Sequence, residues 1–122
     1  MSTRLRGLLA ATYTPFAPDC SLALEDVPPL VERLLADGVG GLYVCGSTGE
    51  GVSLSTAERK QVAEAFVAAA AGRVPVVVQV GHNSLAEACD LAAHAQAVGA
   101  DASSAMPRPG HSTRSAFRCC PA

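Results

Sequence analysis

Gly41-Leu42-Tyr43-Val44-Cys45-Gly46-Ser47-Thr48-Gly49-Glu50 is the stretch of this chain from which its architecture can best be predicted. Residues 41–45 are apolar and favour a buried β-strand, and the glycine-rich run that follows them predicts a tight turn. Ser47 and Thr48 offer hydroxyls and backbone N–H groups that can converge on a carboxylate or phosphate oxygen. Gly46 and Gly49 let the backbone bend and come close to a ligand. The stretch therefore predicts a strand that leads into a small-anion-binding turn.

Two strand-helix units continue the chain after this turn. Ser55 and Glu58 form a capping-box pattern, which predicts the start of a helix that ends at Gly72. Residues 74–80 are apolar and rich in valine, as expected of a strand buried on both faces of a parallel sheet. A second capping box at residues 84–87 predicts a helix that ends at Gly99, and a fourth strand is expected near Asp101.

The residues before residue 41 predict one more unit of the same kind. Residues 5–14 form a mainly apolar run that ends at Pro15, which favours a buried strand closing at a turn. A helical apolar stripe follows over about Asp26 to Asp37, with Pro28 near its start and Gly38 just past its end.

Strict alternation of strands and helices predicts an α/β fold with a parallel sheet and right-handed crossovers. Two architectures satisfy this pattern, a closed (β/α) barrel and an open doubly wound sheet, and periodicity alone does not choose between them. No G-x-G-x-x-G motif follows the first strand, which disfavours the dinucleotide-binding form of the open sheet.

The composition limits the classes of function. The chain has 122 residues, 49% of them apolar, which suits one modest domain. Its net charge is −2 and the basic residues are scattered except near the C-terminus, so no nucleic-acid partner is expected. No apolar run approaches the roughly 20 residues of a membrane span, and no export signal is present, so a cytoplasmic location with reduced cysteines is predicted.

Five stretches of the chain carry a resemblance to a known family. They are Leu8 to Phe16 (LLAATYTPF), Gly41 to Gly51 (GLYVCGSTGEG), Leu54 to Arg59 (LSTAER), Val80 to Ser84 (VGHNS), and Ala93-His94-Ala95 with Gly99 to Ala102 (GADA). Together they resemble the pyruvate-dependent Schiff-base (class I) aldolases, the family that includes N-acetylneuraminate lyase and dihydrodipicolinate synthase. The resemblance runs from about Leu5 to Met106 and looks more like the neuraminate lyase branch.

The resemblance implies a (β/α)₈ TIM barrel in which the turn Gly46, Ser47, Thr48 and Gly49 binds the carboxylate of pyruvate or another 2-oxo acid. Active sites of such barrels lie at the face where these βα turns gather. The resemblance further implies a lysine on a later strand that forms an imine with the 2-oxo carbon, and a tyrosine on another later strand that relays protons. It implies a homo-oligomeric parent enzyme. No cofactor and no metal is expected.

The chain departs from this family pattern in its lysine and tyrosine content. Its one lysine, Lys60, falls in the first turns of an outer helix, and Tyr13 and Tyr43 belong to the first two strands. A complete barrel needs about 250 residues, so three of eight units are expected here. We predict a partial barrel domain over residues 1–106 and an irregular, disordered or frame-shifted tail over residues 107–122.

The sequence thus predicts a truncated aldolase-like lyase that keeps the carboxylate-binding turn but lacks the catalytic lysine and tyrosine, so the chain alone is expected to be inactive and no catalytic residue is assigned. The alternative is a non-enzymatic module that binds small carboxylates or is completed by a partner chain. Glu50 also fits a stabilising role before a helix, and His82 fits a hydrogen-bonded or solvated loop residue. Tyr43 is interpreted as a packing residue, although its proximity to Ser47 leaves a substrate contact open.

Overall fold

The computed structural model describes residues 5–106, which form one parallel sheet with strand order β1-β2-β3-β4. The strands are β1 (Leu9–Ala11), β2 (Gly41–Val44), β3 (Val76–Gln79) and β4 (Ala102–Ser104). The helices are α1 (Val27–Ala36), α2 (Thr56–Ala70) and α3 (Leu85–Ala97), and two short 3₁₀ helices are η1 (Leu24–Asp26) and η2 (Gly51–Ser53).

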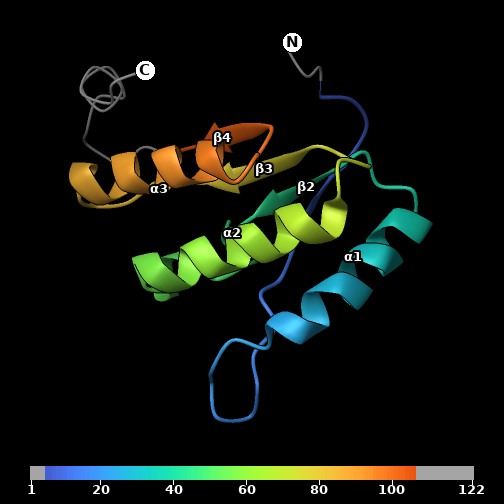
Figure 1. Ribbon diagram of the computed structural model, residues 1–122, viewed down its shortest axis with the longest axis horizontal. Coiled ribbons are helices and arrows are strands. Elements are labelled where there is room, and N and C mark those ends of the chain that lie inside the picture. Colours follow the sequence, from blue (N-terminus) through green and yellow to red (C-terminus); the bar gives the residue numbers. More distant parts are fainter. Residues whose placement is uncertain (1–4, 107–122) are drawn as a thin grey trace.

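The three α-helices lie on the same face of the sheet (Figure 1). α1 packs against α2, and α2 packs against α3, in the same order as the strands beneath them. A doubly wound sheet reverses its strand order and carries helices on both faces, whereas consecutive units of a barrel do neither. The arrangement is that of successive (β/α) barrel units, so the doubly wound alternative is excluded for the described residues.

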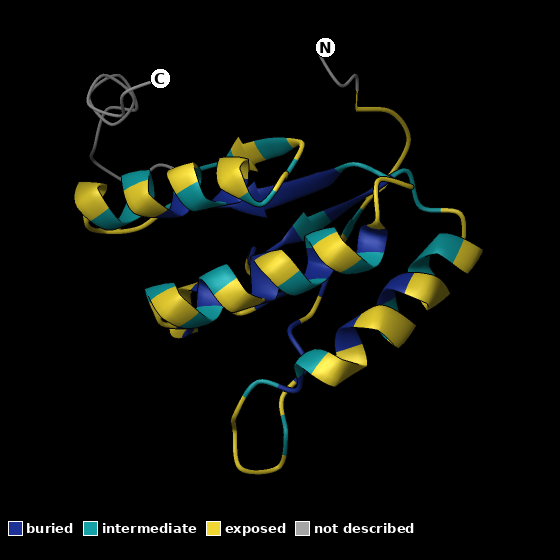
Figure 2. Cartoon of the chain, in the orientation of Figure 1, coloured by how far each residue is buried: buried dark blue, intermediate teal, exposed yellow. Residues whose placement is uncertain are grey.

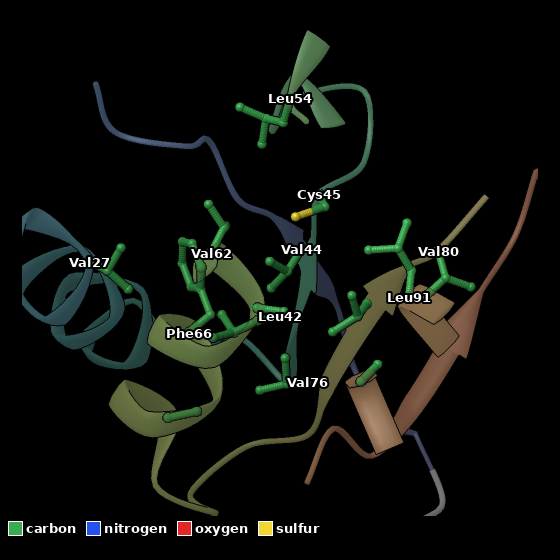
Figure 3. Packing of buried hydrophobic residues seen from close by; sticks show 14 of the residues in the cluster. Val27, Leu42, Val44, Cys45, Leu54, Val62, Phe66, Val76, Val80 and Leu91 are labelled. Atoms are coloured by element: carbon green, nitrogen blue, oxygen red, sulfur yellow. The ribbon is translucent and has the colours of Figure 1, made fainter. Parts of the chain in front are cut away.

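The hydrophobic core lies between the sheet and the helices. Val31, Val62 and Phe66 project from the helices onto Leu42 and Val76 of the sheet, and all five are buried. Figure 3 shows this packing, and Figure 2 shows that the opposite face of each helix is exposed. Burial of each such side chain stabilises the folded chain by about 1.5–3 kcal/mol, and this packing holds the helices against the short strands.

The helix starts depend on serine caps, as predicted. Ser55 accepts a hydrogen bond from the Glu58 N–H at 3.1 Å, and the Glu58 carboxylate accepts from the Ser55 N–H at 2.8 Å. The capping box predicted at Ser84 is only half formed. Ser84 accepts from the Glu87 N–H at 3.4 Å, but the Glu87 carboxylate accepts from the Thr56 hydroxyl of α2 at 2.5 Å instead. A tertiary contact therefore replaces the reciprocal cap.

The lengths and starting residues of two predicted strands differ from those in the structure. The strand expected over residues 5–14 is only three residues long, and within residues 5–106 it pairs only with β2. The fourth strand begins at Ala102, next to its predicted position. The predicted irregular tail, residues 107–122, lies outside the described residues. No helix within residues 5–106 has the length and apolar character to cross a membrane.

The cysteines differ from one another. Cys20 and Cys45 are free thiols, as expected. Cys89 is disulfide-bonded, so the prediction of reduced cysteines is wrong at this position. Pairing depends on the approach of two sulfur atoms in space, and sequence spacing does not reveal it.

Candidate functional site

The glycine-rich turn predicted to bind an anion follows β2 directly. Ser47 and Thr48 are exposed at its apex, whereas Gly46 and Gly49 are buried at its base. Hydrogen bonds from the Glu50 N–H to the Ser47 carbonyl and from the Gly51 N–H to the Gly46 carbonyl, both 3.1 Å, close the turn. Within residues 5–106 neither the backbone N–H groups nor the hydroxyls of Ser47 and Thr48 have a hydrogen-bond partner. The turn therefore presents unpaired donors in the pattern expected for an oxyanion.

The glycines serve packing more than backbone bending, which corrects part of the prediction. A Cβ on Gly46 would lie 2.6 Å from Cε1 of Tyr43, and one on Gly51 would lie 2.0 Å from the carbonyl oxygen of Cys45. The left-handed backbone at the two ends of the turn belongs instead to Cys45 (φ 60°) and Glu50 (φ 55°). This conformation costs a non-glycine residue about 1–2 kcal/mol, and such strain concentrates where surrounding contacts fix a functional loop.

Two buried threonines that follow β1 form hydrogen bonds to the base of the turn and to the end of β2. The Thr14 hydroxyl donates to the Gly49 carbonyl at 2.6 Å. The Thr12 N–H donates to the Tyr43 carbonyl at 3.1 Å, and the Thr12 hydroxyl does so at 3.3 Å. These bonds fix the end of β2 and the base of the turn relative to β1.

Arg59 is a buried cation on α2, in contact with the end of β3. It lies on the inward face of α2 and is only 3% exposed. Its guanidinium donates to the Gly81 carbonyl at 2.8 Å and to the Gln79 carbonyl at 2.5 Å, while Nε is buried without a partner. Within residues 5–106 no ion pair involves Arg59, so no carboxylate there neutralises it. Burial lowers its pKa from the ordinary arginine value, because desolvation disfavours the charged form.

The Cys45 thiol lies close to Arg59. Its Sγ donates to the Arg59 carbonyl at 3.9 Å, and the residue is 2% exposed. Burial raises the pKa of this thiol to about 11, and the opposing effect of the Arg59 charge is smaller. Cys45 is therefore a protonated structural thiol. The guanidinium of Arg59 instead binds the end of β3, through the carbonyls of Gln79 and Gly81.

Lys60 lies on the outer helix α2, as predicted, but it is half-buried rather than fully solvated. Its ammonium forms an ion pair with Asp90 of α3 at 2.6 Å. Two further polar contacts join the same helices, between Thr56 and Glu87 and between Glu64 and His94, and we call the three pairs the α2–α3 ladder. The amine is thus paired with α3, and no hydrogen bond or ion pair within residues 5–106 joins it to the turn.

Tyr43 occupies the face of the sheet opposite the helices. Its ring lies beneath Gly46, and its hydroxyl donates to Oγ of Ser104 on β4 at 3.2 Å. Tyr13 follows β1 and is more than half exposed. The structure thus brings Tyr43, but not Tyr13, into contact with the turn.

The remaining candidates have local roles. His82 Nδ1 accepts from the Ser84 N–H at 2.9 Å, which matches the bystander interpretation. Glu50 makes no side-chain cap to η2 and is exposed. Within residues 5–106 no cluster of His, Cys, Asp and Glu is suited to a metal ion.

Sequence reasoning missed Thr14, Arg59 and Gln79 as parts of the site. Arg59 did carry a detectable signal, since it shares a 3.6-residue period with Val62 and Phe66 and so had to face inward. Thr14 and Gln79 lacked such a signal, because their contacts depend on loops from other units.

Comparison with known proteins places the chain among one group of enzymes. Residues 4–108 match the model of the dihydrodipicolinate synthetase family. N-acetylneuraminate lyase B of Xenopus laevis is 44% identical over 105 residues, which cover 84% of this chain and 40% of the relative. The chain thus spans well under half the length of that relative.

Solved structures give the same result. The N-acetylneuraminate lyase of Proteus mirabilis is 41% identical with a TM-score of 0.81, covering 84% of this chain and 35% of that one. A chloride-inhibited dihydrodipicolinate synthase of Acinetobacter baumannii, complexed with pyruvate, is 28% identical with a TM-score of 0.85, covering 93% and 40%. The shared architecture is the first part of a TIM barrel.

Proposed function

Because this chain belongs to the dihydrodipicolinate synthetase family, we propose that its glycine-rich turn binds the carboxylate of pyruvate or a related 2-oxo acid. Ser47 and Thr48 supply the hydrogen-bond donors, and Gly46 and Gly49 form the close-packed base of the turn. The single observation that carries this proposal is the set of exposed donors on Ser47 and Thr48 that have no partner within residues 5–106.

Electrostatics support the proposal. Charge-assisted hydrogen bonds from N–H and O–H groups to a carboxylate are about twice as strong as neutral ones. Arg59 adds a buried positive charge whose effect reaches the Cys45 thiol, one residue before the turn. The pyruvate complex of the Acinetobacter relative is consistent with a 2-oxo acid as the ligand.

We further propose that the 122-residue chain alone binds without turnover. Schiff-base chemistry requires an amine near the 2-oxo carbon with a lowered pKa. Lys60 is the one lysine of the chain, and its ion pair with Asp90 on the outer helices keeps it away from the turn. The function of the chain is therefore recognition of a carboxylate in a truncated lyase scaffold.

Pyruvate titration of the purified chain tests this proposal. We expect saturable binding that Thr48→Val weakens, because valine keeps the shape of threonine and removes its hydroxyl. Reduction with borohydride in the presence of pyruvate should leave no covalent adduct. Absence of binding would refute carboxylate recognition, and an adduct that Lys60→Gln abolishes would refute the lack of turnover.

A second candidate function is a module completed by a partner chain. It is favoured by the open outer edges of β1 and β4, since each of these strands has a single neighbour in the described sheet. A partner that supplies parallel strands would pair with both edges. Stoichiometric complex formation with a separately produced C-terminal barrel segment of a family member would support this candidate, and a failure to associate would reject it.

A further inference from the structure

A groove of about 520 Å³ lies between α3 and β4, away from the glycine-rich turn. Its walls carry small side chains, among them Ala92, Ala93 and Ala95, so a bulkier side chain can enter it. Two carboxylates, those of Asp90 and Asp101, also line it. The groove therefore suits an occupant that combines an apolar side chain with positive charge.

Cys89 lies on the wall of this groove and is disulfide-bonded. The chain has five cysteines, and Cys20 and Cys45 are free thiols. Within one chain the sulfur bonded to Cys89 therefore belongs to Cys119 or Cys120, the two that remain. Both lie after the described residues. The disulfide thus joins the groove to the part of the chain that follows β4.

The described chain ends close to the start of α3. β4 is parallel to β3, and α3 follows β3, so the end of β4 and the first turn of α3 lie at the same edge of the sheet (Figure 1). A Cβ on Gly81, just before α3, would lie 3.3 Å from the Met106 nitrogen. Cys119 follows Met106 by 13 residues, which span up to roughly 43 Å when extended. α3 has 13 residues and is about 20 Å long, so the segment can enter the groove and reach Cys89.

Residues 107–122 carry the chemistry that the groove accepts. They include three arginines and no acidic residue, so the segment is positively charged. Phe117 is its one aromatic residue and comes two positions before Cys119. A disulfide at Cys89 holds Phe117 within reach of the alanines of the groove, where burial of its ring is favourable. Charge and shape therefore both fit this segment to the groove.

The two carboxylates of the groove can each accept a further donor. Oδ2 of Asp90 pairs with the Lys60 ammonium at 2.6 Å, and Oδ2 of Asp101 accepts from the Val76 N–H at 2.9 Å. Within residues 5–106 the other oxygen of each makes no hydrogen bond. A carboxylate has about four acceptor sites, so an arginine can bind beside the existing partner.

We propose that residues 107–122 dock in the groove between α3 and β4, with Phe117 among its alanines. A disulfide from Cys89 to Cys119 or Cys120 fixes the segment there. The segment then covers the outer side of the last strand-helix unit, and its attachment depends on the redox state of these thiols. This inference does not depend on carboxylate recognition at the turn.

The disulfide forms by exchange with a small disulfide such as oxidised glutathione. One protein thiolate attacks a sulfur of the small disulfide and releases one small thiol. The second protein thiolate attacks the resulting mixed disulfide and releases the other. The two protein thiols lose two electrons and two protons, and the small disulfide is reduced to two thiols.

Non-reducing peptide mapping of the full chain tests the pairing, after equilibration with oxidised glutathione and blocking of free thiols. Trypsin leaves Cys89 in the peptide 74–114, because Arg108 precedes a proline, and it leaves both C-terminal cysteines in the peptide 119–122. We expect monomeric protein to yield these two peptides joined by a disulfide. A disulfide between two copies of the chain, or no link from 74–114 to 119–122, would overturn the proposal.

A glutathione redox titration tests docking separately from pairing. The ratio of oxidised to reduced chain at a fixed glutathione ratio gives the effective concentration of the two thiols, which docking raises. Phe117→Ser should lower this value by about tenfold, because the buried ring is lost. Phe16→Ser removes the same ring at an exposed position before α1 and should leave the value unchanged. Equal values for the wild-type chain and Phe117→Ser would overturn docking.

Ala93→Trp tests where the segment docks. Position 93 is exposed and lines the groove, so tryptophan there occupies the groove without entering the core. The effective concentration should fall as it does in Phe117→Ser, whereas Ala68→Trp, at an exposed position of α2, should not change it. An unchanged value in Ala93→Trp would place the segment elsewhere and overturn the proposal, while leaving carboxylate recognition at the turn intact.

Discussion

Cys45 combines a buried thiol with a left-handed backbone at the entrance to the turn. Its pKa is raised by burial from 9.0 to about 11. Below pH 9 the thiol is protonated in both the folded and the unfolded chain, so it adds no pH dependence. Between pH 9 and 11 the unfolded chain loses this proton first, and the free energy of unfolding falls.

We therefore predict an alkaline loss of stability that depends on Cys45. The difference between 9.0 and about 11 corresponds to about 2.7 kcal/mol at most. Urea unfolding at pH 8 and pH 11 measures the loss, and Cys45→Ser, which does not titrate in this range, serves as the control. If both proteins lose equal stability, the thiol is not the titrating group.

Thr14 gives a second prediction at the scale of single residues. Thr14→Val removes the 2.6 Å hydrogen bond to the Gly49 carbonyl while keeping the side-chain shape. The unpaired buried carbonyl should cost about 1–3 kcal/mol, and pyruvate binding should weaken because the turn loses its support. Thr14→Ser, which keeps the hydroxyl, should restore binding in the same titration. Wild-type affinity in Thr14→Val would show that the turn holds its own shape.

The turn itself could be predicted from sequence, whereas its support could not. Ser47 and Thr48 lie between glycines after a strand, and this local pattern is visible in one segment. The supporting contacts join residues far apart in the chain, such as Thr14 to Gly49 and Arg59 to Gln79. Such contacts depend on how three units pack. Periodicity indicates that Arg59 faces inward, but it does not reveal which groups Arg59 contacts.

At the scale of elements, the two serine caps form a natural comparison. Ser55 makes a reciprocal capping box, whereas Ser84 makes one long bond of 3.4 Å and shares Glu87 with the α2–α3 ladder. We predict that Ser55→Ala destabilises the protein by about 1 kcal/mol and that Ser84→Ala costs less. Chemical denaturation of both variants measures the difference. Equal costs would mean that the reciprocal Glu58 bond adds nothing.

The predicted helices and strands agree best with the structure where the signal lies within a single strand-helix unit. The capping box of α2 and the valines of β3 are local signals, and both were predicted correctly. β1 was predicted too long because its apolar residues suggest a buried strand, yet among the described strands only β2 pairs with it. The Glu87 contact was missed for a similar reason, since its partner Thr56 belongs to another helix.

At the scale of the whole molecule, the described sheet has open outer edges at β1 and β4, with exposed apolar side chains beside the first. Leu8 is 83% exposed just before β1, and its backbone leads into the unpaired edge. A groove lined by small residues, among them Ala92 and Ala95, runs along α3 and β4. Unpaired edges and apolar patches favour association.

We predict that the chain self-associates as its concentration rises. Leu8→Lys should shift sedimentation toward the monomer, because a charge at the edge opposes strand addition. Ala68→Lys adds the same charge at an exposed position of α2 and should not have this effect. A monomer at every concentration, with or without the substitution, would refute edge-driven association.

The consecutive strand order has a consequence for how the chain acquires its structure. Each described strand after β1 pairs with the strand that precedes it in the chain. β2 can therefore pair with β1, and β3 with β2, before the residues that follow them have been synthesised. Each pairing closes the loop of a single helical unit, and the entropic cost of closing a loop grows only slowly with its length. The scaffold around the turn is therefore suited to co-translational folding, in which each βα unit packs on the preceding one during synthesis.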